Sequence, residues 1–284
     1  MRAFEALIFE GGGSKGVAHT GALKELHDSG RLAGIRRFAG SSAGAITALL
    51  LAADFTPCEI GDIVTRAPWA ELLHDRCGVI RDIYRLVRNF GLYQGDVMRN
   101  YLNSVLEKRF GIADMTFEQL YALTSNELRM GACDVQSSSF VFLDRSSTPD
   151  MPVALAAQAS AAIPLIFAAV PYGSALYCDG GVLGNLPGCA FPDHFALALE
   201  LVGPAMPTAD MPEHVGNYMY RVVDMMMTAT QKVHGKNALK NGQVLEITIP
   251  QGFRSLETKV VGNYADTLSA LGAQAARDFF TRKR

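Results

Sequence analysis

The sequence predicts an α/β fold with a largely parallel central sheet, in one domain over residues 1–284. Short runs of mostly apolar residues without alternation, such as 6–9 and 195–201, are typical of strands that are buried on both faces. Segments with helical character alternate with these runs, as expected for parallel strands joined by helices. The chain is 49% hydrophobic and has no repeat or change of composition. This is enough apolar material for one large core.

The elements follow one another in a regular order. An apolar strand at 6–9 leads through a glycine-rich loop at 10–16 into a helix at 17–26. A strand at 35–39 precedes a helix at 43–53, which is almost entirely Ala, Leu and Ile. Further helices are expected at 54–69, 72–93, 95–110, 116–123, 153–162, 206–230 and 264–282, and further strands at 128–134, 138–143, 175–178 and 244–249, with an apolar loop at 163–167.

Two of these segments have a second interpretation. The segment 72–93 carries four arginines at amphipathic spacing and resembles a lid, although a solvated helix face packed on the core is the simpler interpretation. The segment 206–230 holds six of the eleven methionines. Methionine can line an acyl pocket, but ordinary filling of the core is expected here.

Composition and charge exclude several classes of function. The net charge is −2 and the pI is about 6.3, so nothing favours binding to nucleic acid. Five cysteines are scattered without a CxxC pair, which argues for a reducing compartment and against a disulfide framework. No zinc-ligand spacing occurs, so we expect no metal. Without a signal peptide or an apolar run of about 20 residues, the expected location is cytoplasmic, and secretion without a cleaved signal stays open.

The spacing Gly40-x-Ser42-x-Gly44 has the form of a nucleophile elbow. In such a turn the serine has a strained backbone conformation, and the positions two residues away come too close to their surroundings for side chains. The helix that follows would place its positive end beneath Ser42, where it favours a developing oxyanion. A tight turn with a buried, inert serine is the alternative.

The glycine-rich loop has three interpretations. Gly11-x-Gly13-x-x-Gly16 matches the dinucleotide fingerprint, but arginines stand about 20 residues further on, where an acidic residue is expected. A P-loop is excluded because Val17 follows Gly16. An oxyanion hole that serves Ser42 fits the neighbourhood better, because free backbone N–H groups in such a loop bind anions.

The base that would activate Ser42 is not decided by pattern alone. Asp179-Gly180-Gly181 follows a strand and is a turn by default. His194, His214 and His234 come after Asp179, so the chain order permits a Ser-Asp-His triad. None of these histidines lies in a turn-rich setting, and the elbow follows only one clear strand.

Four stretches together resemble the patatin-like phospholipase family. Singly they are weak signals, but they occur in the family's order and span about two thirds of the chain. They are the loop Gly11-Gly12-Gly13-Ser14-Lys15-Gly16, the elbow Gly40-Ser41-Ser42-Ala43-Gly44, the segment 159–167, and Asp179-Gly180-Gly181 followed by Asn185 and Pro187.

The resemblance implies a three-layer α/β/α fold and a catalytic Ser42–Asp179 dyad without a histidine. It also implies an oxyanion loop, with Lys15 at its basic position, and no cofactor. The substrate would be a phospholipid or another acyl-ester lipid, met in transient contact with a membrane surface. The alternatives are a dinucleotide-dependent oxidoreductase, a catalytically inactive lipid-binding module, and an acyltransferase that uses the same acyl-enzyme.

Overall fold

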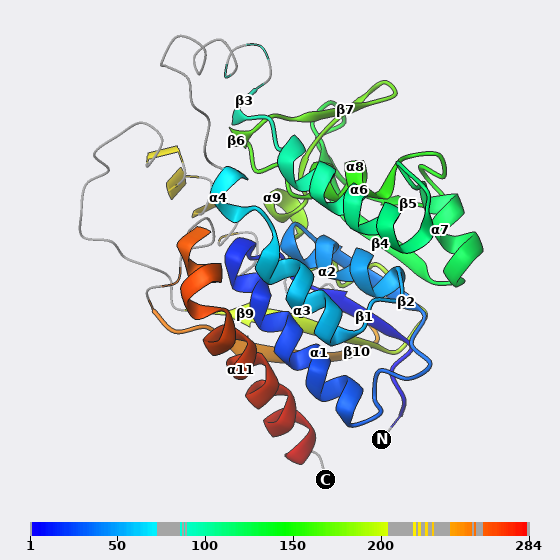
Figure 1. The fold of residues 1–284 in the computed structure, drawn as a ribbon, viewed down its shortest axis with the longest axis vertical. Helices are drawn as coiled ribbons and strands as arrows, with labels where there is room; N and C mark the ends of the chain where they lie inside the picture. The colour runs from blue at the N-terminus through cyan, green and yellow to red at the C-terminus, as the bar shows by residue number, and fades with distance from the viewer. Residues whose placement is uncertain are drawn as a thin grey trace.

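An eight-stranded sheet forms the centre of the computed structural model, which describes residues 2–72, 90–203, 239–251 and 258–282 and the single positions 86, 88, 218, 219, 221, 222, 225, 226, 229 and 253 (Figure 1). Its order is β10-β9-β1-β2-β4-β8-β7, with β5 also paired to β4. The strands are β1 (Ala6–Phe9), β2 (Arg37–Ser41), β4 (Glu127–Asp134), β5 (Ser139–Asp144), β7 (Val170–Tyr172), β8 (Ala175–Asp179), β9 (Ala196–Val202) and β10 (Gly242–Thr248).

The sheet is parallel from β10 through β9, β1 and β2 to β4, and antiparallel where β4 meets β5 and β8. The prediction of an α/β fold with a largely parallel sheet is therefore confirmed. The strands predicted at 128–134 and 138–143 are β4 and β5, which pair as an antiparallel hairpin. A separate parallel pair, β3 (Gly91–Tyr93) with β6 (Leu165–Phe167), corrects two expectations, because 91–93 was expected to end a helix and 163–167 to be a loop.

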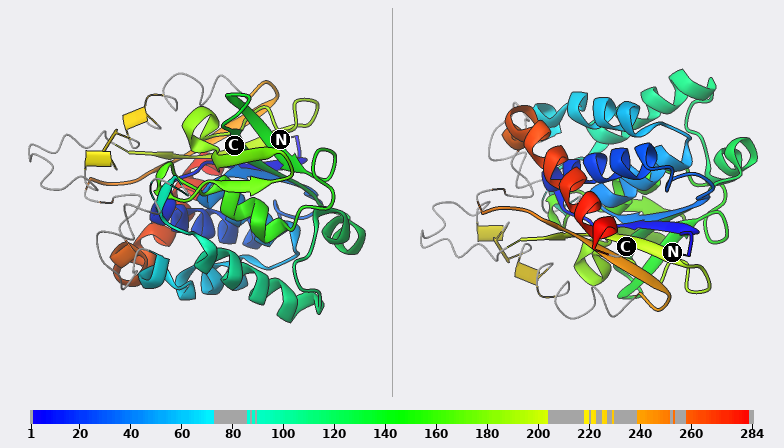
Figure 2. Two further views of the ribbon diagram at one scale, coloured as in Figure 1. Left: turned by 90° about the horizontal axis from the view of Figure 1, so that it is seen from above. Right: turned by 90° about the horizontal axis from the view of Figure 1, so that it is seen from below.

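Most of the described helices lie on one face of the sheet, as Figure 2 shows from two directions. Leu7 and Phe9 point to this face and belong to the main core with residues of α1, α2 and α11. Ala6 and Ile8 point to the other face, where Leu186 and its neighbours cover them. The helical elements are η1 (Gly13–Val17), α1 (Ala18–Asp28), α2 (Ala43–Ala52), α3 (Pro57–Arg66), α4 (Trp69–Leu72), α6 (Asp96–Phe110), α7 (Phe117–Thr124), α8 (Val153–Ser160), α9 (Gly181–Gly184) and α11 (Thr258–Thr281).

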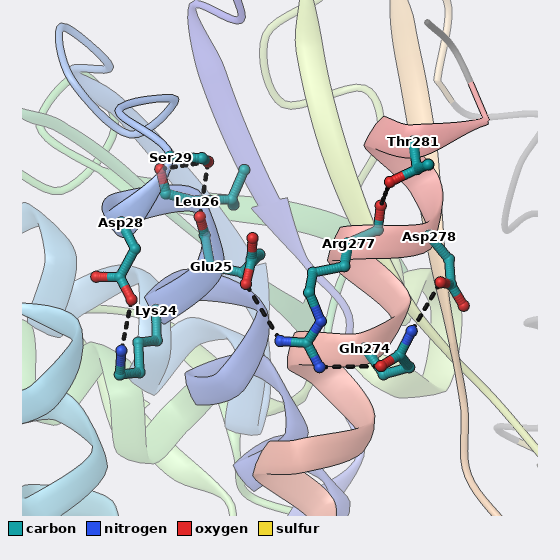
Figure 3. Close-up of polar contacts among 9 residues, drawn as sticks. All are labelled: Lys24, Glu25, Leu26, Asp28, Ser29, Gln274, Arg277, Asp278 and Thr281. Carbon is teal, nitrogen blue, oxygen red and sulfur yellow. Dashed lines mark hydrogen bonds and ion pairs between the residues drawn. The ribbon is translucent and has the colours of Figure 1, made fainter.

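Helix α1 follows the glycine-rich loop and is held from outside by α11. A Cβ on Gly21 would lie 1.7 Å from the Ser269 carbonyl oxygen, so the two helices touch through their backbones. Further along, Arg277 pairs with Glu25 at 3.3 Å (Figure 3). This contact fixes the helix that carries the loop, since α1 begins immediately after it.

Some expectations concern residues outside the described ranges. The segment 72–93 lies mostly there, as do the methionine-rich segment 206–230, His214 and His234. Within the described ranges, every helix is too short or too polar to cross a bilayer.

Candidate active site

Ser42 has the backbone geometry of the predicted elbow. It lies between β2 and α2 with φ 54° and ψ −125°, a conformation that is strained for a residue other than glycine. A Cβ on Gly40 would lie 2.3 Å from the Gly44 carbonyl carbon, and one on Gly44 would lie 2.3 Å from the Phe9 carbonyl oxygen. Both positions therefore need glycine for the reason that the pattern indicates.

A serine on α8 holds the elbow in place. The Ser42 N–H donates to the Ser160 carbonyl oxygen at 3.2 Å and to its hydroxyl at 3.0 Å. The Ser160 hydroxyl in turn donates to the Gly131 carbonyl oxygen at 2.6 Å. Ser160 belongs to the third stretch of the family resemblance, but the sequence did not indicate this role.

Strand β4 brings Ser42 and Asp179 together. Strand β2 pairs with its first half and ends with Ser41 opposite Gly131, and β8 pairs with its second half and ends with Asp179 opposite Ala132. The Glu127 N–H donates to the Arg36 carbonyl oxygen, just before β2, and the Val135 N–H donates to the Leu176 carbonyl oxygen in β8. Because these residues are an even number apart in one strand, both amides point to the same edge.

Two strands therefore share one edge of β4 and run toward each other. Since β2 is parallel to β4 and β8 is antiparallel, their carboxyl ends meet. Ser42 follows one of these ends and Asp179 closes the other. Residues 137 positions apart in the sequence become neighbours in this way.

Asp179 is completely buried, and burial raises its pKa from 3.8 to about 7. Two interactions lower the pKa but do not cancel the effect of burial: the Gly181 N–H donates to Oδ1 at 2.7 Å, and the Ser42 hydroxyl lies close to the carboxyl group. The buried Oδ2 makes no hydrogen bond of standard geometry within the described chain. At neutral pH this carboxyl group is close to half ionised and has one oxygen available, as a general base requires.

The glycine-rich loop packs against the elbow. A Cβ on Gly11 would lie 3.0 Å from the Ser42 Cβ, and one on Gly16 would lie 2.9 Å from the Ala43 Cβ. The Gly11 N–H donates a hydrogen bond to the Asn185 carbonyl oxygen, and the Lys15 N–H donates one to the Gly12 carbonyl oxygen.

The amides of Gly12 and Gly13 have no such partner in the described chain. Gly13 has φ 55°, which favours glycine. Among the six residues predicted for an oxyanion site, Gly12 and Gly13 therefore have backbone N–H groups that are available to bind an anion.

Two buried polar residues beside the loop were not predicted to have a role. Glu10, at the end of β1, has a pKa raised by burial to about 8. Asn185, at the end of α9, donates from Nδ2 to Glu10 Oε1 at 3.0 Å and to the Gly11 carbonyl oxygen at 3.2 Å. The sequence signal for Asn185 was its place in the fourth stretch of the resemblance.

The described histidines do not form a triad with Ser42 and Asp179. His194 precedes β9, at the end of the sheet opposite Ser42, and its ring packs on Phe191. His19 is fully buried, its Nε2 lies 3.0 Å from the Glu10 carbonyl oxygen, and burial lowers its pKa to about 4. His19 is therefore neutral at pH 7, and its ring contacts the backbone at the start of the glycine-rich loop.

A narrow apolar cavity of about 20 Å³ lies next to the loop and the elbow. It begins at Gly13 and Ala43, and α3, α4 and α6 contribute to its walls. The polar atoms of two wall residues are turned to the backbone: Tyr101 donates to the Ile63 carbonyl oxygen and Trp69 to that of Val64. The wall of this cavity is mostly apolar as a result.

Comparisons with known proteins agree with this architecture. The family model described as patatin-like phospholipase matches residues 7–188. The uncharacterized protein YqhO of Bacillus subtilis is 31% identical over 63% of this chain and 64% of its own length. The probable lipid hydrolase 463L of Invertebrate iridescent virus 6 is 28% identical over 65% of this chain and 62% of its own length. This chain thus matches less than two thirds of the length of either relative.

Two solved structures have a similar fold. VipD from Legionella pneumophila aligns with a TM-score of 0.62 and 16% identity, over 98% of this chain and 66% of its own. ExoU from Pseudomonas aeruginosa, in complex with SpcU, aligns with a TM-score of 0.52 and 18% identity, over 97% of this chain and 52% of its own.

Proposed function

Because the chain belongs to the patatin-like phospholipase family, we propose that it is a serine lipid acyl hydrolase that cleaves an acyl ester through an acyl-enzyme. Ser42 is the nucleophile, Asp179 the base, and the amides of Gly12 and Gly13 are the oxyanion donors. The observation that carries the proposal is the meeting of the β2 and β8 ends on one edge of β4, which sets Ser42 against a buried carboxyl group.

The proposed reaction uses this geometry in two steps. The Ser42 hydroxyl attacks the ester carbonyl carbon while its proton passes to the Asp179 carboxylate. The carbonyl oxygen becomes an oxyanion and accepts hydrogen bonds from the Gly12 and Gly13 amides. The alcohol then leaves with the proton from Asp179, and the acyl group stays on Ser42.

Water completes the cycle. Asp179, again a carboxylate, takes a proton from a water molecule that attacks the acyl-enzyme, and then returns a proton to Ser42. A base with an ordinary aspartate pKa near 3.9 would be too weak for this work. The raised pKa of about 7 supports Asp179 in this role.

A lipid is the substrate class that the surroundings support. The wall beside Gly13 and Ala43 is apolar, and an acyl chain is the part of an ester that such a wall can contact favourably. The name of the viral relative, a probable lipid hydrolase, supports the same class.

The proposal is tested with wild type and Ser42→Ala on a panel of phospholipids, neutral lipid esters and p-nitrophenyl esters. We expect hydrolysis of at least one lipid ester by the wild type and a loss of 1,000-fold or more, on the order typical of nucleophile removal, in the variant. A fluorophosphonate should label wild type at Ser42 and leave the variant unlabelled. Equal hydrolysis by both proteins, or labelling at another residue, would contradict the proposal.

A further inference from the structure

Asn185 holds the backbone of the glycine-rich loop on both sides of Gly11. Its Nδ2 donates to the Gly11 carbonyl oxygen at 3.2 Å, and its own carbonyl oxygen accepts the Gly11 N–H at 3.1 Å. The same Nδ2 donates to Glu10 Oε1 at 3.0 Å. We propose, resting on the function above, that Glu10 and Asn185 are positioning residues that keep the Gly12 and Gly13 amides aimed at the oxyanion.

Gly11 has no free space between Asn185 and the nucleophile. A Cβ on Gly11 would lie 2.4 Å from Asn185 Oδ1 and 3.0 Å from the Ser42 Cβ. The Asn185 side chain thus forms one wall of a narrow slot and Ser42 forms the other. Without the Asn185 amide, Gly11 can move away from Ser42, and the next two amides move with it.

Glu10 anchors this arrangement to the sheet. Its Oε2 accepts the Leu201 N–H at 2.5 Å, so one carboxyl group connects the end of β1, strand β9 and Asn185. Asn185 follows Asp179 by six residues and ends α9. The clamp of Glu10 and Asn185 therefore joins the loop of the base to the loop of the oxyanion donors, and the two halves of the site keep one relative position.

A neutral Glu10 carboxyl group is compatible with a position beside the proposed oxyanion site. A carboxylate beside a developing oxyanion would oppose its charge. Burial raises the Glu10 pKa to about 8, and the negative charge of Glu200 adds to this rise, while the hydrogen bonds from the Leu201 N–H and Asn185 and the charge of Lys15 oppose it. At pH 7 the group is mostly neutral, so it supports the loop without that electrostatic cost.

The test measures kcat, KM and the affinity for an ester-like trifluoromethyl ketone, which forms a tetrahedral oxyanion on a serine. Asn185→Ala and Glu10→Ala should each lower kcat about ten- to a hundredfold, part of the effect of losing an oxyanion donor. KM for a short soluble ester should change by less than about threefold, because the clamp acts on the transition state. Ketone affinity should fall by the same factor as kcat/KM.

Two further variants separate positioning from stability. Glu10→Gln keeps an acceptor for Asn185 and should recover most of the activity that Glu10→Ala loses. The double variant Glu10→Ala/Asn185→Ala should lose little more than either single variant, because both changes break the same clamp.

Asn126→Ala is the matched control. Asn126 is 2% exposed, and its Nδ2 donates to the Ala52 carbonyl oxygen at 3.0 Å and to Asp54 Oδ1 at 2.8 Å. It contacts the far end of α2, about 15 Å from Ser42 for a helix of this length. The control should lower the melting temperature and leave kcat and ketone affinity of the folded protein unchanged.

The outcomes separate the two proposals. If the wild type hydrolyses esters and Asn185→Ala keeps its kcat and ketone affinity, the positioning role of Glu10 and Asn185 is wrong and the proposed function stands. A loss of kcat with unchanged ketone affinity also overturns the clamp. A wild-type chain that neither hydrolyses an ester nor binds the ketone overturns the function, and the role assigned to the clamp with it.

Discussion

Each end of the sheet carries a buried asparagine, but the two side-chain amides are paired differently. At the end where β4 begins, the Asn126 amide is fully used: Nδ2 has two acceptors and Oδ1 accepts from Arg36. At the end around Ser42, Asp179 Oδ2 and Asn185 Oδ1 are buried without a hydrogen-bond partner in the described chain. A buried polar atom without a partner costs free energy, so such atoms are expected where function requires them.

Backbone strain differs in kind between the two ends. Ser42 combines φ 54° with ψ −125°, whereas Ser125, next to Asn126, has φ 57° and ψ 20°, the left-handed conformation that commonly ends a helix. The glycines around Ser42 lie against backbone atoms. Helices α3 and α7, away from this end, begin with capping boxes at Thr56 and Thr116, as expected of ordinary helices. Under the proposed function, one end of the sheet serves chemistry and the rest serves stability, and each prediction below tests this division.

The largest expected effect is on activity, from Asp179→Asn. The amide keeps an acceptor for the Gly181 N–H but cannot take a proton, so kcat/KM should fall about 1,000-fold or more. Ester hydrolysis by wild type and variant measures this. Survival of most of the activity would remove Asp179 from the mechanism.

The same variant should be more stable than wild type at pH 8. In the folded wild type the Asp179 pKa is about 7 instead of 3.8, so the folded state binds the proton more tightly and loses stability as pH rises between these values. The difference should be about 4 kcal/mol at pH 8 and near zero below pH 4. Urea unfolding at both pH values measures it, and equal stability at pH 8 would contradict the burial argument.

The next largest expected effect is a loss of folding stability in the variant Gly44→Ala. A Cβ there meets the Phe9 carbonyl oxygen at 2.3 Å, and backbone cannot yield cheaply, so Gly44→Ala should destabilise by about 3 kcal/mol or more. Gly61→Ala, in α3, is the control, since its Cβ meets nothing within 4 Å. This helix position should gain about 0.5–1 kcal/mol. Thermal unfolding of both variants should show opposite signs.

A smaller effect is the pH dependence of activity. The base must be ionised, so kcat/KM should rise about tenfold per pH unit below pH 7 and level off above it. A pH profile with a soluble ester locates the midpoint. A midpoint near pH 4 would mean that Asp179 titrates as an exposed aspartate.

The smallest effect is expected at the other end of the sheet, from Glu127→Gln. It breaks an ion pair with Arg37 at 3.3 Å between partly exposed groups, which should cost less than about 1 kcal/mol. Activity should remain at the wild-type level. A large loss of activity would mean that the two ends of the sheet are coupled.

Much of the local structure could be predicted from the sequence. The first strand was predicted with its observed bounds, and strands β4 and β5 to within one residue at each end. The elbow at Ser42 was also recognised, because it depends on residues within a few positions of one another. Strands β3, β6 and β7 were missed, because three residues are too few to show a period.

The sequence by itself determined the α/β class, the elbow and the glycine-rich loop, since their signals are local. The tertiary structure alone decided that β2 and β8 meet on one edge of β4, and that Asn185 lies between Glu10 and Gly11. It also decided that Asp179 and Glu10 are buried with raised pKa values. The reason is physical: strand pairing and burial depend on groups far apart along the chain, which no local pattern records.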